Sequence, residues 1–402
     1  MTIADTLPGP ELTAPWCTPE RLALQHQARR FAADEIFPLA NRLDPAKAEM
    51  PDDLIERIAH HGYFGITVGA EHGGLGLGTF EYCMITEELA RAWMSVASII
   101  ARAQGMGTQI GDAARREELL AKSARGQWIG AAALSEPDAG SDLAAVSTRA
   151  VADGQQWVIN GRKRWTGFAK SADFIQVLCR VREPRPNEPR AAGLANLVVE
   201  KRRGSFPEGV TGRPIDKIGY HGFTTWDLLF ENVRVARTNL IAAPDGTAAF
   251  KSVQKNLNVA RVHTAARAVG LARAAVEDCA AYLQKRVQFG RPLSDFQALR
   301  FTLATMAARV DQARAFYQQV AHLIDTGQPC VREAAMVKLL ATEMAAEVTS
   351  QGMQLYGGNG YTTEHQVERY WRDARLTTIF EGTSQIQQHI IAERLLGKET
   401  AS

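Results

Sequence analysis

Residues 1–125 alternate between stretches with apolar side chains at helical spacing and short glycine-rich breaks. Thr18 and Pro19 are typical of a helix N-cap and first turn, and apolar side chains then recur at helical spacing to about Leu43. Glycines over residues 73–78 interrupt the pattern. Further helices are expected at Asp52–His61, Phe80–Trp93 and Ala113–Ser123. The pattern therefore predicts an all-helical N-terminal region.

Residues 126–243 change to short runs rich in β-branched and aromatic side chains. Turns are indicated at Asp153-Gly154 and at Asn160-Gly161. Strands are expected at Trp128–Leu134, Trp157–Asn160, Phe174–Leu178, Leu197–Val199 and Trp226–Phe230. This part of the chain is therefore predicted to form a small central β domain.

Long Ala-rich and Leu-rich stretches return from residue 244 onward, each long enough to pack in a helical bundle. Helices are expected at Phe250–Val287, Phe296–Asp325, Arg332–Tyr356 and Ser384–Leu396. This order of elements is not the βαβ alternation of a doubly wound fold, and no G-x-G-x-x-G lies between a strand and a helix. The sequence thus disfavours a nicotinamide-binding or nucleotide-hydrolysing fold.

Charge and cysteine content narrow the class further. Lys and Arg total 46 against 44 Asp and Glu, so the net charge of +2 gives no field that would hold nucleic acid or an anionic membrane. The five cysteines lie outside any C-x-x-C pattern, which favours buried free thiols in a reducing compartment. No leader pattern or apolar run of about 18 residues is present. We expect a cytoplasmic protein without nucleic-acid or membrane partners.

Three segments place glycines or hydroxyl side chains at the end of a predicted helix or strand. Each is a candidate ligand contact, and each also has an ordinary structural interpretation. Leu134–Asp142 closes a predicted strand, where backbone N–H groups and serines can approach a polar ligand, or it is only a turn. Arg286–Gly290 ends a long helix, where the arginine can simply favour the helix dipole. Gln354–Tyr361 ends another helix in glycines, which leave the main chain open to a ligand.

Glu381 is the strongest candidate for acid–base chemistry. It follows the apolar Ile379 and Phe380, and Thr383 is placed to cap a helix that runs to Gly397. Partial desolvation by its neighbours is expected to raise the pKa of the carboxyl group toward the range of a general base, and the helix N-terminus offers N–H donors to an oxyanion. The alternative is a plain first-turn acid that completes the cap.

Together these segments resemble the acyl-CoA dehydrogenase family of flavoproteins from about Pro19 to Gly397. The resemblance rests on Leu134–Asp142, on Gln354–Asp373 with its Gly-Gly-Asn-Gly, and on the Phe-Glu-Gly-Thr-Ser-Gln run that contains Glu381. It implies a mostly α fold with a central β-barrel-like domain and a C-terminal four-helix bundle. The implied domains are residues 1–125, 126–243 and 244–402.

The resemblance also implies FAD as the cofactor and a homodimer, usually paired into a tetramer, because part of the flavin site comes from a neighbouring subunit. Residues that match flavin contacts within one chain are Ser135, Ser141, Trp165, Thr166, Thr383 and Gln385. Those that match contacts from the neighbouring subunit are Arg286, Phe289, Gln297, Gln354, Gly357 and Gly358.

By the same resemblance, Glu381 would remove the α-proton of an acyl-CoA thioester while the β-hydrogen leaves as hydride to the flavin. The product would be a trans-2-enoyl-CoA, as in fatty acid metabolism, and the electrons would pass to an electron-transfer flavoprotein. Arg261 matches an arginine behind the base, where its charge would limit the rise in pKa. Residues that match substrate contacts are Ser141, Asn258, Arg261 and Gly382.

Three positions depart from the family pattern. Gly167 stands where a hydroxyl is usual after the tryptophan, Asn258 replaces an aspartate, and Phe223 replaces a serine beside the acyl group. Arg102 lies in a segment that approaches the acyl pocket in this family. We interpret it as a surface arginine, with pairing to a substrate carboxylate as the alternative.

These departures leave other functions open. Asn258 and the basic stretch Lys201–Arg203 also suit dehydrogenation of an acyl group on a carrier protein, although the basic stretch can equally be a solvated hairpin end. The missing hydroxyl at Gly167 keeps open a flavin-dependent monooxygenase on the same fold. A thioester-binding protein without catalysis is a further alternative.

Overall fold

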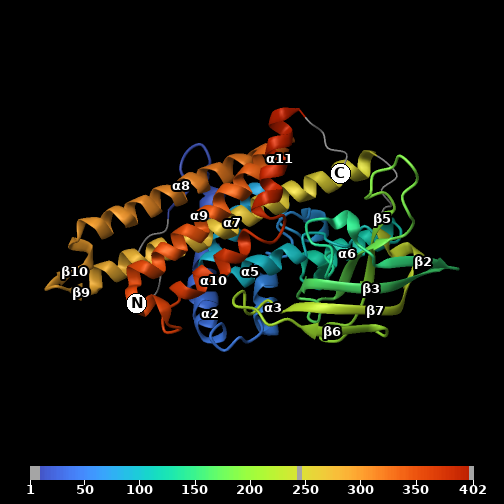
Figure 1. Ribbon diagram of the computed structural model, residues 1–402, viewed down its shortest axis with the longest axis horizontal. Coiled ribbons are helices and arrows are strands. Elements are labelled where there is room, and N and C mark those ends of the chain that lie inside the picture. The colour runs from blue at the N-terminus through green and yellow to red at the C-terminus, as the bar shows by residue number, and fades with distance from the viewer. Residues whose placement is uncertain (1–9, 242–246, 398–402) are drawn as a thin grey trace.

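The computed structural model describes residues 10–241 and 247–397, and it places the β sheet at one end of an elongated molecule and the helical bundle over the rest (Figure 1). The expected boundary between residues 243 and 244 and the first residues, Met1 to Asp5, lie outside the described residues. None of the described helices is both long and apolar enough to cross a membrane.

The N-terminal region is helical, as predicted. Thr18 caps the first helix by accepting a hydrogen bond from the Arg21 backbone N–H at 3.3 Å. The stretch predicted as one helix to Leu43 contains a π-helical turn at Ala32–Ile36. The α-helices are α1 (Pro19–Phe31), α2 (Phe37–Leu43), α3 (Asp52–His60), α4 (Thr79–Ala92), α5 (Met94–Ile99) and α6 (Ala113–Ala124). Apart from Glu81, every residue of α4 is buried, so this helix forms the centre of the region.

The central region forms one sheet in the order β6-β7-β3-β2-β4-β5-β8, with β1 paired to β4. The predicted turn at Asp153-Gly154 joins β2 to β3 and is confirmed. The turn predicted at Asn160-Gly161 is wrong, because β3 continues through it with a bulge and Gly161 has a φ of 150°. The strands are β1 (Gly130–Ala133), β2 (Arg149–Asp153), β3 (Gln156–Gly167), β4 (Phe174–Arg180), β5 (Leu194–Glu200), β6 (Val210–Pro214), β7 (Thr225–Ala236) and β8 (Leu240–Ile241).

The C-terminal region is a helical bundle joined to α4. Its helices are α7 (Thr247–Lys285), α8 (Gln297–Asp325), α9 (Val331–Tyr356), α10 (Val367–Thr377) and α11 (Ser384–Leu396). A short hairpin of β9 (Val287–Gln288) and β10 (Arg291–Pro292) joins α7 to α8. Helix α7 packs against α4, α8 and α9, and α10 and α11 pack against α9.

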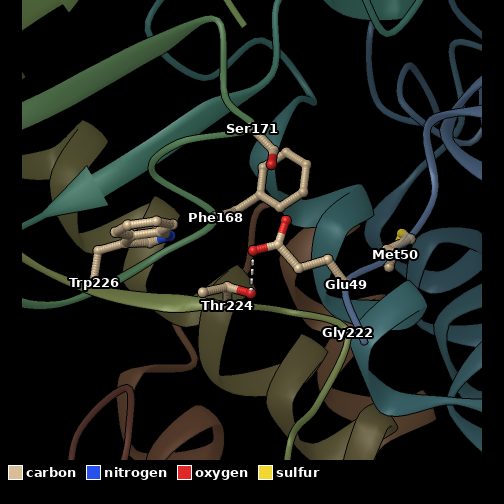
Figure 2. Close-up of a pocket in the computed structure, with 7 residues that line it drawn as sticks. All are labelled: Glu49, Met50, Phe168, Ser171, Gly222, Thr224 and Trp226. Carbon is tan, nitrogen blue, oxygen red and sulfur yellow. Dashed lines mark hydrogen bonds between the residues drawn. The ribbon is translucent and has the colours of Figure 1, made fainter. Parts of the chain in front are cut away.

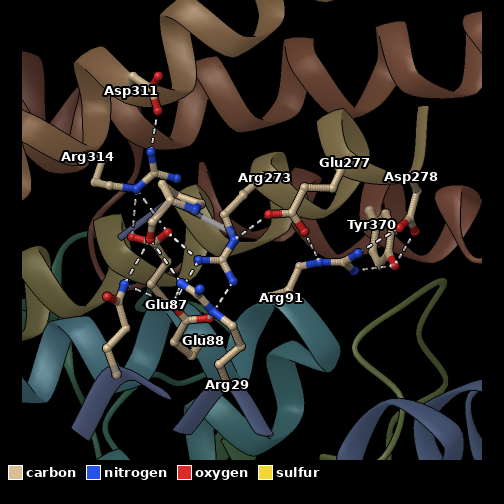
Figure 3. Close-up of polar contacts among 12 residues, drawn as sticks. Arg29, Glu87, Glu88, Arg91, Arg273, Glu277, Asp278, Asp311, Arg314 and Tyr370 are labelled. Atoms are coloured by element: carbon tan, nitrogen blue, oxygen red, sulfur yellow. Dashed lines mark hydrogen bonds and ion pairs between the residues drawn. The ribbon is translucent and has the colours of Figure 1, made fainter. Parts of the chain in front are cut away.

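Buried ion pairs link α4 to the bundle (Figure 3). Arg273 of α7 pairs with Glu87 at 2.9 Å and with Glu88 at 2.6 Å. Arg91 pairs with Asp278 at 2.6 Å. Burial by itself would raise the pKa of Glu88, but the charges of Arg273 and Arg29 hold that pKa at about 2. Because each charge has a partner, the network fixes how α4 sits on α7.

The expectation of buried free thiols holds for Cys83, Cys179, Cys279 and Cys330. Cys17 is also a free thiol, but it is exposed, so that part of the expectation is wrong.

Candidate active site

Glu381 lies in the turn between α10 and α11 and has an unusual backbone. Its φ is 52° and that of Gly382 is 89°, a conformation that is unfavourable for a residue with a side chain. The Gly382 carbonyl accepts hydrogen bonds from Lys338 Nζ at 2.6 Å and from Gln387 Nε2 at 3.0 Å. Thr383 caps α11 by accepting from the Ile386 N–H at 3.2 Å. The turn is therefore held from α9 and from α11.

One oxygen of the Glu381 carboxylate is fixed by α7. Its Oε2 accepts a hydrogen bond from Arg267 at 2.7 Å and another from the Thr264 hydroxyl. Thr264 and Arg267 are three residues apart and so lie on one face of the helix. The Glu381 side chain stays 30% exposed, whereas that of Arg267 is 1% exposed. Among residues 10–241 and 257–397, whose side chains the structure describes, no group hydrogen-bonds Oε1, which leaves that oxygen to accept a proton.

The expectation of a raised pKa for Glu381 is wrong. Burial does act to raise it, but the positive charge of Arg267 and the hydrogen bond from Thr264 outweigh burial and lower the pKa to about 2. The two apolar neighbours that prompted the expectation do not enclose the carboxylate. Ile379 is 51% exposed, and the ring of Phe380 lies under the Arg267 guanidinium at 4.8 Å.

The arginine behind the base is Arg267, so the assignment to Arg261 is also wrong. Arg261 donates instead to Asn258 Oδ1 at 3.1 Å. Six residues along a helix turn the side chain by about 240°, so Arg261 and Arg267 face different ways. An arginine inside the alanine-rich run of residues 265–275 is the signal by which the sequence could have identified Arg267, because such a charge needs a buried partner.

Ser135, Trp165 and Thr166, which were predicted to contact the flavin, lie together where β1 ends beside β3. The Arg164 N–H donates to the Ser135 carbonyl at 2.9 Å. Trp165 has a φ of 66° and is 55% exposed, which is unusual for so large an apolar side chain. The Thr166 hydroxyl is buried without a hydrogen-bond partner. An exposed ring beside an unsatisfied hydroxyl fits a flat, polar-edged ligand such as a flavin.

Other predicted flavin contacts lie near the end of the molecule that is opposite the β sheet. Arg286 and Phe289 lie at the β9–β10 hairpin, and Phe289 is 93% exposed with a φ of 53°. A Cβ atom added at Gly357 or Gly358 would meet nothing within 4 Å. The hairpin lies at the opposite end of the molecule from β3 (Figure 1). The remaining predicted contacts in this part of the chain are Gln297 and Gln354, both exposed at helix ends.

The last three predicted residues lie in three different places. Gln385 lies in the first turn of α11, next to the Glu381 turn. Ser141 is exposed in the segment between β1 and β2. Asn258 is 8% exposed on α7, and its side chain contacts Arg261 rather than Glu381.

Two departures from the family pattern are in contact. A Cβ atom on Gly167 would lie 2.3 Å from a ring carbon of Phe223, so the phenylalanine ring fills the space of a side chain at residue 167. Phe223 is 1% exposed. The loss of a side chain at Gly167 and the large side chain at Phe223 therefore compensate for one another in the packing.

Arg102 does not fit the description of a surface arginine. It ends a short 3-10 turn after α5, is half-buried, and has its Nε shielded from solvent without a hydrogen-bond partner. Its guanidinium lies over the Phe223 ring at 5.5 Å. Its charge also helps to lower the pKa of Glu381. Thr264, Arg267 and Lys338 are further site residues that the sequence did not predict, and Arg102 is one that it assigned to the surface.

A small pocket adjoins Thr166 and Phe223, since Trp226 pairs with Thr166 and Phe168 stacks on Phe223. Beside it the Thr224 hydroxyl donates to Glu49 at 2.9 Å (Figure 2). The pocket is lined by Glu49, Met50, Phe168, Ser171, Gly222, Thr224 and Trp226. None of these was predicted to contact the flavin or the thioester.

Comparison with known proteins gives matches along nearly the whole chain. Family models match residues 18–127 (acyl-CoA dehydrogenase, N-terminal domain), 131–233 (middle domain) and 249–396 (C-terminal domain). A 3-(aryl)acrylate reductase of Clostridium sporogenes is 35% identical, covering 94% of this chain and 99% of that protein. A (2S)-methylsuccinyl-CoA dehydrogenase of Cereibacter sphaeroides is 35% identical, covering 93% and 69% respectively.

Among solved structures, butyryl-CoA dehydrogenase from Megasphaera elsdenii superposes with a TM-score of 0.86 at 29% identity, covering 94% of this chain and 99% of that one. The described helices and sheet therefore form the fold that the resemblance implied. This chain belongs to the acyl-CoA dehydrogenase family, whose members are FAD-dependent oxidoreductases.

Proposed function

We propose that the protein oxidises an acyl-CoA thioester to the trans-2-enoyl thioester, with Glu381 as the general base. The observation that carries this proposal is the state of the Glu381 carboxylate. Arg267 and Thr264 hold its Oε2, and Oε1 has no partner within the described ranges. A fixed and ionised carboxylate with one free oxygen can receive a proton without reorganising.

The groups around Glu381 suit proton abstraction next to a carbonyl. The backbone N–H of Glu381 has no acceptor among residues 10–241 and 257–397, so it can donate to a thioester oxygen and acidify the α-carbon. FAD, when bound, supplies the acceptor for the β-hydrogen as hydride. Ser135, Trp165 and Thr166 would hold the flavin ring beside the turn that carries the base.

A pKa of about 2 makes the ligand-free carboxylate a weak base. An acyl chain that covers the exposed part of the Glu381 side chain would remove water from it and raise its pKa. Binding of the substrate would thus strengthen the base when it is needed. Arg267 limits this rise and keeps the carboxylate ionised.

Anaerobic titration of the holoenzyme with straight-chain acyl-CoA thioesters tests the proposal through bleaching of the flavin absorbance. Glu381→Gln should still bind FAD but react about 10²–10⁴-fold more slowly. Glu208→Gln removes an exposed carboxylate in the β region and serves as the control. Bleaching by Glu381→Gln at the wild-type rate would remove Glu381 from the mechanism.

We also infer that the enzyme is a homo-oligomer whose flavin site is shared between subunits. The β9–β10 hairpin, beside which Arg286 and Phe289 lie, is at the opposite end of the molecule from β3, which carries Trp165 and Thr166 (Figure 1). A single chain therefore does not bring them together, whereas a twofold pair of chains can. An electron-transfer flavoprotein is the acceptor that we propose from the family resemblance.

The carrier-protein alternative loses part of its support. Arg203 pairs with Asp173 at 2.5 Å, and Lys201 donates to the carbonyls of Lys170 and Ala172. The basic stretch is therefore used within its own domain. A CoA thioester is the better proposal, and one relative reported above is named for methylsuccinyl-CoA, a thioester that keeps a free carboxylate.

A further inference from the structure

Arg102 differs from the three arginines Arg91, Arg267 and Arg273 in having no carboxylate partner. Arg91 and Arg273 pair with acidic side chains in the interior (Figure 3), and Arg267 pairs with Glu381. Within the side chains that the structure describes, those of residues 10–241 and 257–397, Arg102 forms no ion pair, and its shielded Nε has no hydrogen-bond acceptor. A shielded N–H group without an acceptor is unfavourable, whereas an added acceptor at this guanidinium would be favourable.

A series of aromatic rings connects Arg102 to the base. The guanidinium lies over Phe223 at 5.5 Å, and the Phe223 ring stacks on Tyr220 with 5.0 Å between centroids. Tyr220 meets Phe380 edge-on at 6.2 Å, and Phe380 precedes Glu381. We call Tyr220, Phe223 and Phe380 the aromatic wall. Arg102 therefore stands at the end of this wall that is away from Glu381.

The charges around Glu381 do not balance. Arg102 and Arg267 both act on Glu381 and lower its pKa, so two guanidinium groups act on one carboxylate. His263, which is stacked on Tyr82 at 4.6 Å, adds no charge at neutral pH, because burial and then Arg267 lower its pKa well below its ordinary value. The two guanidinium groups and the one carboxylate therefore carry a net positive charge, which a second anion would neutralise.

We propose that Arg102 binds a second carboxylate on the acyl group, so that the substrate is the CoA thioester of a dicarboxylic acid. This inference rests on the proposed function, which places the α-carbon at Glu381. The acyl chain then runs along the aromatic wall, and its far carboxylate meets the guanidinium. Arginine suits this role because its planar fork can donate two parallel hydrogen bonds to one carboxylate.

Phe223 gives the proposal a second support. Its ring occupies the space of a side chain at Gly167 and carries the guanidinium on its face. The ring therefore supports Arg102 at the position where the chain departs from the family pattern. A serine there would remove the aromatic face that the cation occupies.

The test compares succinyl-, glutaryl- and adipyl-CoA, each with its own terminal amide, so that charge changes while length stays the same. Binding to the holoenzyme is measured by calorimetry in the Glu381→Gln background, where oxidation does not interfere. We expect at least one acid to bind about 10- to 100-fold more tightly than its amide. Arg102→Gln should abolish this preference, and Arg102→Lys, which keeps the charge but not the fork, should retain part of it.

Arg149→Gln, which removes an arginine that is 60% exposed, is the matched control and should leave the preference in place. Thermal unfolding shows whether each variant is folded, and the lysine variant keeps the test valid if the glutamine variant is not. Equal binding of acid and amide at every length, or a preference that survives Arg102→Gln, would overturn the proposal.

Failure of the proposed function has a different readout. Bleaching of the wild-type flavin by butyryl-CoA, together with equal binding of acids and amides, would leave the dehydrogenase proposal standing and reject the role of Arg102. A clear preference for the acids without bleaching by any thioester would support the carboxylate site and reject the reaction.

Discussion

At the scale of single residues, Arg267 sets the protonation state of Glu381. Because the folded pKa of Glu381 is about 2, the base stays ionised at any ordinary assay pH. Arg267→Gln removes the main opposing charge, so we expect the acid limb of kcat/KM to move to higher pH. The measurement is a pH–rate profile with saturating FAD.

Arg261→Gln is the matched comparison, because its guanidinium bonds Asn258 and not the base. That variant should leave the acid limb where it is, whatever it does to the rate. The same shift affects stability. A lowered folded pKa means that Glu381 contributes stability above its unfolded value of about 4.3, and this contribution is lost as the pH falls toward 2. An unmoved limb in Arg267→Gln would contradict the assignment.

Lys338 is a residue that positions the turn carrying Glu381. It is fully buried, and its Nζ donates to the Gly382 carbonyl at 2.6 Å, next to the strained backbone of Glu381. Lys338→Met should lower kcat about 10-fold or more with little change in flavin content, because the base loses its fixed geometry. Lys338→Arg should recover part of the rate if donation to the carbonyl is what matters. Full activity of the methionine variant would show that Gln387 holds the turn alone.

The sequence identified Glu381 through the local motif but not the groups that tune it. Thr264 and Arg267 lie more than a hundred residues earlier and meet the base only through the packing of α7 beside the turn. The sign of the pKa shift depends on those contacts, which neighbours in sequence do not reveal. A charge inside an alanine-rich helix was the available signal.

At the scale of elements, the contact between Gly167 of β3 and Phe223 explains two departures at once. Adding a methyl group at Gly167 forces it against a buried ring, so Gly167→Ala should lower the free energy of unfolding by about 1–3 kcal/mol. In a Phe223→Leu background the same substitution should cost less. Chemical denaturation of the four proteins in a double-mutant cycle measures the coupling. Strictly additive effects would mean that the two residues are not in contact.

Helix and strand positions were more predictable than their interruptions. Helix α11 was predicted with the bounds that the structure gives, because Thr383 and Gly397 mark its two ends. Helix α10 was missed because charged residues dominate it, and its buried stripe of Val367, Tyr370 and Ala374 becomes clear only once the bundle is packed. The bulge at Gly161 is not distinguishable from a turn by local sequence, because Asn-Gly is also a hairpin signal.

At the scale of the whole molecule, the order of domains followed from periodicity, whereas the pairing of distant segments did not. The buried pairs between Arg273 and Glu87 and Glu88 join residues nearly two hundred positions apart. The two parts of the proposed flavin site are likewise distant in sequence, and their pairing, which would be between subunits, does not follow from periodicity either. The sequence resemblance assigned Arg286 and Phe289 to a neighbouring chain, and the position of the β9–β10 hairpin away from β3 supports that proposal.

Subunit complementation tests the shared site. Glu381→Gln disables the site of the chain that carries it, because the base is lost. Arg286→Ala disables the site of the neighbouring chain, because the contact to that chain's flavin is lost. In a mixed dimer, one site would combine the intact Glu381 of one chain with the intact Arg286 of the other. Mixed dimers isolated from this pairing should therefore have about half of the activity of wild-type dimers, since one of their two sites is intact.

The experiment uses two affinity tags, co-expression and excess FAD, with activity measured on dimers that carry both tags. Chains that carry both substitutions, co-expressed with one another, provide the control and should stay inactive, because no pairing of them restores a site. Mixed dimers no more active than the two parent variants would show that Arg286 serves the site of its own chain. In that case the chain would have to bring the β9–β10 hairpin to β3 by a rearrangement along its full length, which the buried ion pairs between α4 and α7 oppose.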